Sequence, residues 1–145
     1  MKRSEQREAI FKLLFMALFN EEEEMPEKMK FYLDTMEDGS EEEKELIPSA
    51  EESAYIREKY QKIQEKLPEI DEILNANSRG WKTGRMSKVD LTILRLAVFE
   101  VKFDDRIPTG VAINEAVEIA KRFGGDESAS FINGILGKVA RDTEA

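Results

Sequence analysis

The stretch from Ser87 to Lys102, SKVDLTILRLAVFEVK, constrains the fold more than any other part of the chain. Its apolar residues recur at helical spacing and cover most of the helix circumference, leaving a narrow polar edge of Lys88, Thr92, Arg95 and Lys102. Ser87, followed three residues later by Asp90, is typical of a helix start, because the serine hydroxyl accepts a free backbone N–H there. A helix this apolar needs neighbours on most sides, so the stretch predicts a helical core.

Two amphipathic segments follow this helix closely and are expected to pack against it. They span residues 111–123 and 126–141, and Gly124 and Gly125 separate them. In the second segment Phe131 is expected inside with the aliphatic residues, while Ser130, Gly134 and Gly137 share one face. Because a glycine within a helix costs roughly 1 kcal/mol relative to alanine, that face predicts a tight crossing with another helix.

The N-terminal half carries the same kind of pattern. Helices are predicted over residues 4–20, from Pro26 to Gly39, from Ser49 to Leu67 and, after a break, from Pro68. The acidic tract 38–45 is expected to be a disordered linker. No alternating stretch predicts a strand. The expected fold is all-α, with about seven helices in a single domain of residues 1–145, divided into helical subdomains 1–78 and 79–145.

Arg95 interrupts the apolar helix, and its charge needs a partner if the side chain is buried. The expected partner is a carboxylate of the next helix, first of all Glu115. The same carboxylate lies three residues before Glu118, but the Glu-x-x-His pattern of helical metal sites is missing, and Glu118 with Arg122 is better explained as a surface ion pair.

The composition argues against an enzyme. The chain has no histidine and no cysteine, which removes the usual general base, the commonest metal ligand and the thiolate nucleophile. We therefore expect no catalytic residues, no cofactor and no metal. No segment approaches the roughly 20 apolar residues that cross a bilayer, and no signal sequence is recognisable, so a cytoplasmic protein without a membrane partner is expected.

Charge is distributed unevenly along the chain. The formal net charge is −9, yet residues 21–78 hold 19 acidic and 7 basic residues, whereas residues 1–20 and 79–106 are net positive. The basic residues flank Trp81 and mark helix ends: Lys2, Arg3, Arg7, Arg79, Lys82, Arg85, Lys121 and Arg122. Cations beside an aromatic ring suit a single-stranded RNA, although surface cations are usually only solvated and a tryptophan more often fills a core.

Four segments resemble the transcription antitermination factor NusB family. RMSKVDLTILRLAVFEV is similar to the family's "VD+.ILRLA.YE" helix, IPTGVAINEAVEIAKRFG to "IP..VAINEAVELAK.FG", and ESASFINGIL to "..S.KFVNGIL". REAIFKLLF, from Arg7, resembles the opening "RE.A.Q.LY" helix. Residues 21–78 match only in helical pattern.

The resemblance implies two packed helical subdomains without catalytic activity. It also implies binding to boxA-type single-stranded RNA of ribosomal RNA leaders together with NusE, a small-subunit ribosomal protein. That complex would act with other Nus factors on RNA polymerase to suppress termination. By position, the family's RNA contacts fall on Arg3, Arg7, Glu127 and Phe131.

This chain departs from the family at two places. It has Arg3-Ser4-Glu5-Gln6-Arg7 where several consecutive arginines are usual, and Ser130 where the family has a lysine. Both changes remove positive charge, so we expect weaker RNA binding by the protein alone, a shallow salt dependence and greater reliance on NusE.

Two other interpretations compete with this one. The first is a helical scaffold or homodimer that binds protein and has lost RNA binding. The second follows from a resemblance to the N-terminal module of ribosomal RNA cytosine methyltransferases. It is disfavoured because we expect no catalytic domain and find no catalytic cysteine.

Overall fold

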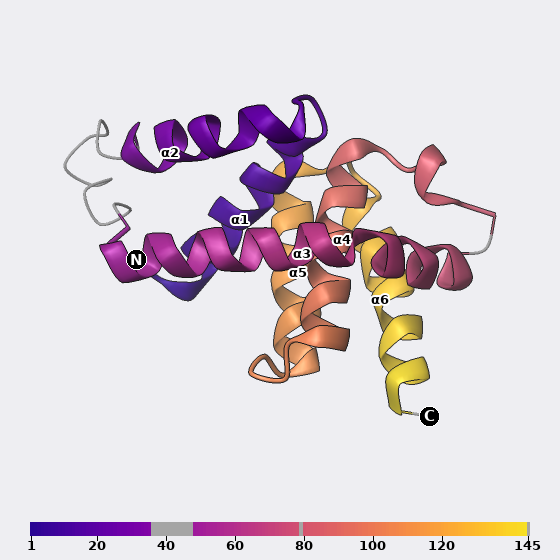
Figure 1. Cartoon of the computed structure of the whole chain (residues 1–145). Helices are drawn as coiled ribbons and strands as arrows, with labels where there is room; N and C mark the ends of the chain where they lie inside the picture. Colours follow the sequence, from indigo (N-terminus) through magenta and orange to yellow (C-terminus); the bar gives the residue numbers. More distant parts are fainter. Residues whose placement is uncertain (36–47, 79, 145) are drawn as a thin grey trace. The chain divides into compact units, whose positions relative to one another are not determined.

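A computed structural model shows an all-α protein, as predicted (Figure 1). The structure describes residues 1–35, 48–78 and 80–144. No strand occurs in these ranges, and they contain six α-helices and two short 3₁₀ helices. Their bounds are α1 Arg3–Ala17, η1 Glu22–Glu24, α2 Met25–Thr35, α3 Ala50–Asn77, η3 Thr83–Arg85, α4 Lys88–Phe103, α5 Thr109–Phe123 and α6 Ser128–Glu144.

The predicted break at Pro68 is wrong. Helix α3 continues through this residue for 28 residues, which reduces the expected number of helices by one. Proline inside a helix removes one backbone hydrogen bond and costs about 3 kcal/mol. Ile63 before it and Ile70 and Leu74 after it are all fully buried, so burial of both halves of α3 offsets this cost.

The chain forms two compact units, Met1–Lys62 and Ile63–Ala145. The division falls inside α3, whereas the sequence suggested subdomains that meet between residues 78 and 79. The N-terminal unit contains α1, α2 and the first half of α3, and the C-terminal unit contains the second half of α3 with α4, α5 and α6.

Helix α4 is the core of the C-terminal unit. It contacts both α5 and α6, and α5 also contacts α6, so the three helices lie side by side (Figure 1). Ser87 precedes α4, and its hydroxyl accepts the backbone N–H of Asp90 at 3.1 Å, as predicted. Most residues of α4 are buried, among them Ile93, Leu94, Leu96, Ala97 and Val98.

Arg95 does pair with a carboxylate, but the predicted partner, Glu115, is wrong. Its guanidinium binds both oxygens of Asp71 on α3, at 2.9 and 2.8 Å. The side chains of Arg95 and Asp71 are 16% and 26% exposed. Since Arg95 lies on the narrow polar edge of α4, its bidentate bond ties α4 to α3 rather than to α5.

The tight helix crossing predicted on α6 is also wrong for the described residues. A Cβ added at Gly134 would meet nothing within 4 Å, and one at Gly137 would meet only the Arg141 guanidinium at 3.4 Å. Helix α6 instead packs through its aliphatic face, Ile132, Ile135, Leu136 and Val139. The small residues therefore lie on the outer face of the helix.

The N-terminal unit has an apolar core of its own. Ile10 and Leu13 of α1 and Ile56 of α3 are almost inaccessible, and α2 buries Met25, Met29 and Leu33. Pro26 occupies the first turn of α2, as expected from its missing N–H. The predicted end of that helix at Gly39 and the predicted disordered tract 38–45 lie outside the described residues. None of the helices described is long and apolar enough to span a bilayer.

Candidate nucleic-acid interface

A partly exposed aromatic pair joins the loop before α4 to the first turn of α6. The rings of Trp81 and Phe131 meet edge to face, with centroids 6.2 Å apart. Trp81 is 55% exposed, and Phe131 is half-buried rather than part of the core. Aromatic side chains that lie together at the surface are enriched where a partner binds, so this pair is a candidate binding surface.

The end of α3 holds Trp81 in place. Gly80 has a φ of 71°, a left-handed conformation that side chains disfavour, and it reverses the chain after α3. The Ser78 hydroxyl lies 2.6 Å from the carbonyl oxygen of Trp81, and Asn75 accepts the backbone N–H of Thr83 at 2.9 Å. The aromatic pair is thus presented by an anchored loop, which lowers the entropy cost of binding.

Cations flank this pair in the sequence. Lys82 and Arg85 are both exposed, and the Lys82 ammonium donates to the backbone carbonyl of Asn75 at 3.1 Å. Arg79, the third basic residue predicted here, lies outside the described residues. Lys82 and Arg85 therefore provide positive charge on the same loop as Trp81.

The turn between α5 and α6 carries the next predicted residues. A Cβ at Gly124 would lie 2.5 Å from Cβ of Ser128, so only glycine allows the last turn of α5 to approach α6 this closely. The Ser128 hydroxyl accepts the backbone N–H of Gly125 at 2.9 Å. Three exposed charged residues flank this tight turn: Lys121 and Arg122 in the last turn of α5, and Glu127 just before α6.

Two of these charges have partners. Lys121 binds Glu118 at 3.4 Å, and the Arg122 guanidinium lies 5.1 Å from the ring centre of Phe123. Both contacts are exposed, where an ion pair contributes less than about 1 kcal/mol. Lys121 can therefore turn to a phosphate at little cost.

The predicted basic residues of α1 behave differently from one another. Lys2 and Arg3 are exposed. Arg7 is only 8% exposed and interacts within the protein, so the expectation of a surface contact from this arginine does not fit its burial.

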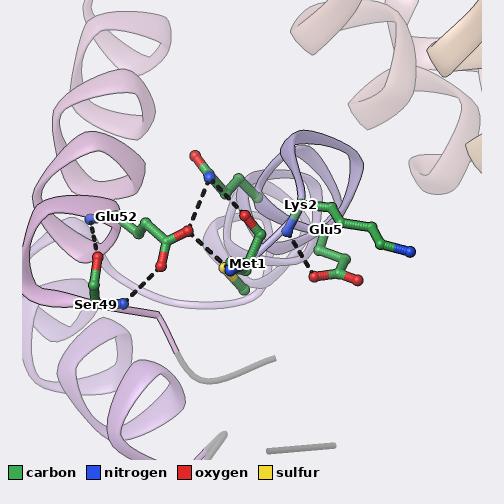
Figure 2. Close-up of polar contacts among 6 residues, drawn as sticks. Met1, Lys2, Glu5, Ser49 and Glu52 are labelled. Atoms are coloured by element: carbon green, nitrogen blue, oxygen red, sulfur yellow. Dashed lines mark hydrogen bonds and ion pairs between the residues drawn. The ribbon is translucent and has the colours of Figure 1, made fainter. Parts of the chain in front are cut away.

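A polar network fixes the start of α1 to the start of α3 (Figure 2). Glu52 is at its centre. One carboxylate oxygen accepts the backbone N–H of Ser49 at 2.8 Å, and the other accepts the α-ammonium group of Met1 at 3.1 Å and the Gln6 amide at 3.2 Å. The Ser49 hydroxyl in turn accepts the N–H of Glu52, which completes the predicted capping box.

The same network sets the charge of Glu52. The hydrogen bond from the Ser49 backbone, and then that from the α-ammonium group, lower the pKa of the Glu52 carboxyl below its ordinary value of 4.5. The backbone N–H of Lys2 donates to Glu5 at 2.9 Å. The backbone at Lys2 is therefore held by Glu5, and the neighbouring Met1 is held by Glu52. The side chains of Lys2 and Arg3 extend from this fixed segment.

The predicted site residues fall into two groups, one in each compact unit. Lys2, Arg3 and Arg7 belong to the N-terminal unit, and Lys82, Arg85, Lys121, Arg122, Glu127 and Phe131 belong to the C-terminal unit. No cluster of three potential metal ligands occurs in the part of the chain that the structure describes. Spacing alone did not reveal that Trp81 contacts Phe131, because 50 positions separate the two.

The fold and this surface together define an all-α protein that carries solvent-exposed aromatic and cationic side chains in its C-terminal unit. The NusB family matches residues 4–141 of the chain. Two proteins named transcription antitermination protein NusB are similar over almost their whole length. The one from Lachnoclostridium phytofermentans is 51% identical, covering 96% of this chain and 98% of its own, and the one from Agathobacter rectalis is 48% identical, covering 97% and 100%.

A solved structure of the same family has a similar fold. T. maritima NusB superimposes with a TM-score of 0.78 at 31% identity, covering 98% of this chain and 92% of its own. The chain belongs to the NusB family of transcription antitermination proteins.

Proposed function

We propose that this protein binds boxA-type single-stranded RNA of ribosomal RNA leaders together with the ribosomal protein NusE. In the cytoplasm the complex joins other Nus factors on RNA polymerase and suppresses termination. The protein itself catalyses no reaction. Family membership supports the role in antitermination, and the surface of the C-terminal unit supports the RNA partner.

The observation that carries this proposal is the exposed Trp81–Phe131 pair with cations beside it. Single-stranded RNA is bound by stacking of unpaired bases on aromatic rings and by phosphate contacts to lysine and arginine. Trp81 is 55% exposed and supplies an aromatic ring on which a base can stack, while Lys82 and Arg85 lie within a few residues of it in the sequence. Lys121 and Arg122 add charge at the other end of the turn that leads to Phe131.

The structure supports weak binding by the protein alone. Arg7 is buried, which leaves Lys2 and Arg3 as the exposed cations at the start of α1. Ser130, which replaces the lysine usual in the family, is exposed on α6 and supplies no charge. With fewer phosphate contacts, fewer counterions are released and the protein alone binds RNA with a smaller free energy. NusE then supplies a larger share of the binding free energy of the complex.

The test is the affinity for a boxA-type RNA, with a scrambled RNA as control, measured over a range of salt concentrations with and without NusE. We expect selective binding that NusE strengthens strongly, and a shallow dependence on salt without NusE. Tight binding without NusE would contradict the predicted reliance on it. Binding of NusE or of a second copy of the chain, with no RNA selectivity in either case, would instead favour the scaffold or homodimer.

A further inference from the structure

An open pocket of about 370 Å³ lies where the end of α3 meets the last turns of α6. Its lining consists of Ala76 and Asn77 from α3 and of Lys138, Arg141 and Asp142 from α6. All five residues belong to the C-terminal unit. None of them was among the site residues expected from the sequence.

The two cations of the pocket are available to a ligand. Neither Lys138 nor Arg141 pairs with a carboxylate of the described residues, although Asp142 lines the same pocket. The Arg141 side chain lies back along α6, with its guanidinium 3.4 Å from the position of a Cβ at Gly137. The helix dipole stabilises cations in the last turns of a helix. It does not explain why both of these cations line the same pocket.

The pocket lies along α6 from the aromatic pair. Phe131, Gly134, Lys138 and Arg141 follow one another at spacings of three and four residues, so they share a face of the helix. Phe131 and Lys138 are separated by about 10 Å at 1.5 Å per residue. Between them lies Gly134, which has no side chain. A Cβ added there would have no atom of the described chain within 4 Å.

We infer that Lys138 and Arg141 form a phosphate-binding site that continues the RNA path from Trp81 and Phe131 along α6. A strand whose base stacks at Trp81 would follow the open face at Gly134 and place a backbone phosphate between the ammonium and the guanidinium. Arginine and lysine are the side chains that recognise phosphate in this way. This inference rests on the proposed function, because it assigns a second contact to the same RNA.

The test uses a boxA-type RNA and the same RNA extended by a few nucleotides at its 5′ or its 3′ end, bound to the full chain in the presence of NusE. We expect one extended RNA to bind the unaltered protein more tightly than the core RNA. The double variant Lys138→Ala, Arg141→Ala is expected to lose this gain. For two phosphate contacts the loss corresponds to roughly 5- to 25-fold weaker binding of the extended RNA. The affinity for the core RNA should be unchanged.

A matched variant controls for net charge. Lys102→Ala with Arg106→Ala removes two cations from the end of α4 and the turn after it, outside the pocket, and should leave both affinities unchanged. Asp142→Asn should strengthen binding of the extended RNA, and Asp105→Asn, an exposed carboxylate elsewhere, should not. Thermal melts confirm that each variant is folded.

The outcomes separate this inference from the proposed function. If the unaltered protein binds no boxA-type RNA, the proposed function fails. If it binds the core RNA but gains nothing from either extension, or if the double variant weakens core and extended RNA alike, only the phosphate site fails. If the double variant keeps its RNA affinity and loses NusE, the pocket is a protein-binding surface and the inference is overturned.

Discussion

The two groups of basic residues show how differently positive charge can be used in one small protein. At the start of α1, Arg7 is buried, and the backbone around Lys2 is held by Glu5 and by the network centred on Glu52. In the C-terminal unit, Lys82, Arg85, Lys121 and Arg122 are all exposed, and Trp81 with Phe131 adds aromatic surface.

This difference shows that a basic residue in the sequence is not by itself a binding residue. Arg7 contributes to the fold, whereas Lys82 and Arg85 contribute to a surface that has exposed rings as a second feature. Stacking and charge together distinguish a nucleic-acid surface from ordinary solvated cations. We therefore expect the C-terminal unit to dominate RNA affinity, and Arg7 of α1 to matter mainly for stability.

The largest effect is expected at the aromatic pair. Trp81→Ala with Phe131→Ala should weaken RNA binding by about 1–3 kcal/mol, roughly 5- to 150-fold, because stacking of a base on an aromatic ring is lost. The affinity is measured by titration in the presence of NusE. Phe31→Ala removes a ring that is 71% exposed in the N-terminal unit and should leave RNA affinity unchanged. Equal losses in the two variants would show that the aromatic pair has no special role.

Much of this fold follows from the sequence, because helical periodicity and capping pairs are local signals. The start of α4 at Ser87, the capping box of Ser49 and Glu52, and the end of α5 at Gly124 were all predicted. The predictions failed where contacts with residues distant in the sequence determine the structure. Pro68 is tolerated because the α3 residues on both sides of it are buried, and Arg95 binds Asp71, which is 24 positions away.

The candidate site was predictable only in part, for the same reason. Sequence pattern and family resemblance named Phe131 and the exposed cations. They did not show that Trp81 meets Phe131, that Arg7 is buried or that Lys138 and Arg141 share a pocket, because each of these depends on tertiary packing.

A second comparison separates the two arginines of α1. Arg7→Ala should lower the free energy of unfolding by about 1–3 kcal/mol, since a buried polar contact is lost. Arg3→Ala should change it by less than about 0.5 kcal/mol, and should make the salt dependence of RNA binding shallower by about 0.7 in the log–log slope. Urea unfolding and RNA titrations measure these values. The reverse pattern of stabilities would mean that Arg7 is a surface contact after all.

The smallest effect concerns pH and the network at the start of α1. The pKa of Glu52 is lowered in the folded protein, so its contribution to stability is complete above the ordinary pKa of 4.5 and is lost as the pH falls through the folded value. Glu52→Gln should therefore lower the melting temperature near neutral pH, and this difference from the unaltered protein should shrink in acid. Glu51→Gln, at an exposed neighbouring position, should show no such trend. A difference that stays constant with pH would contradict the assignment.

The most direct test of the RNA surface uses Trp81, because it is the only tryptophan in the chain. Its fluorescence is followed while boxA-type RNA is added to the protein with NusE, and the emission of NusE alone is subtracted. If a base stacks on the indole ring, the emission changes saturably at RNA concentrations that match the binding curve, and a scrambled RNA has a much weaker effect. RNA binding that leaves the Trp81 emission unchanged would show that the RNA contacts another part of the protein.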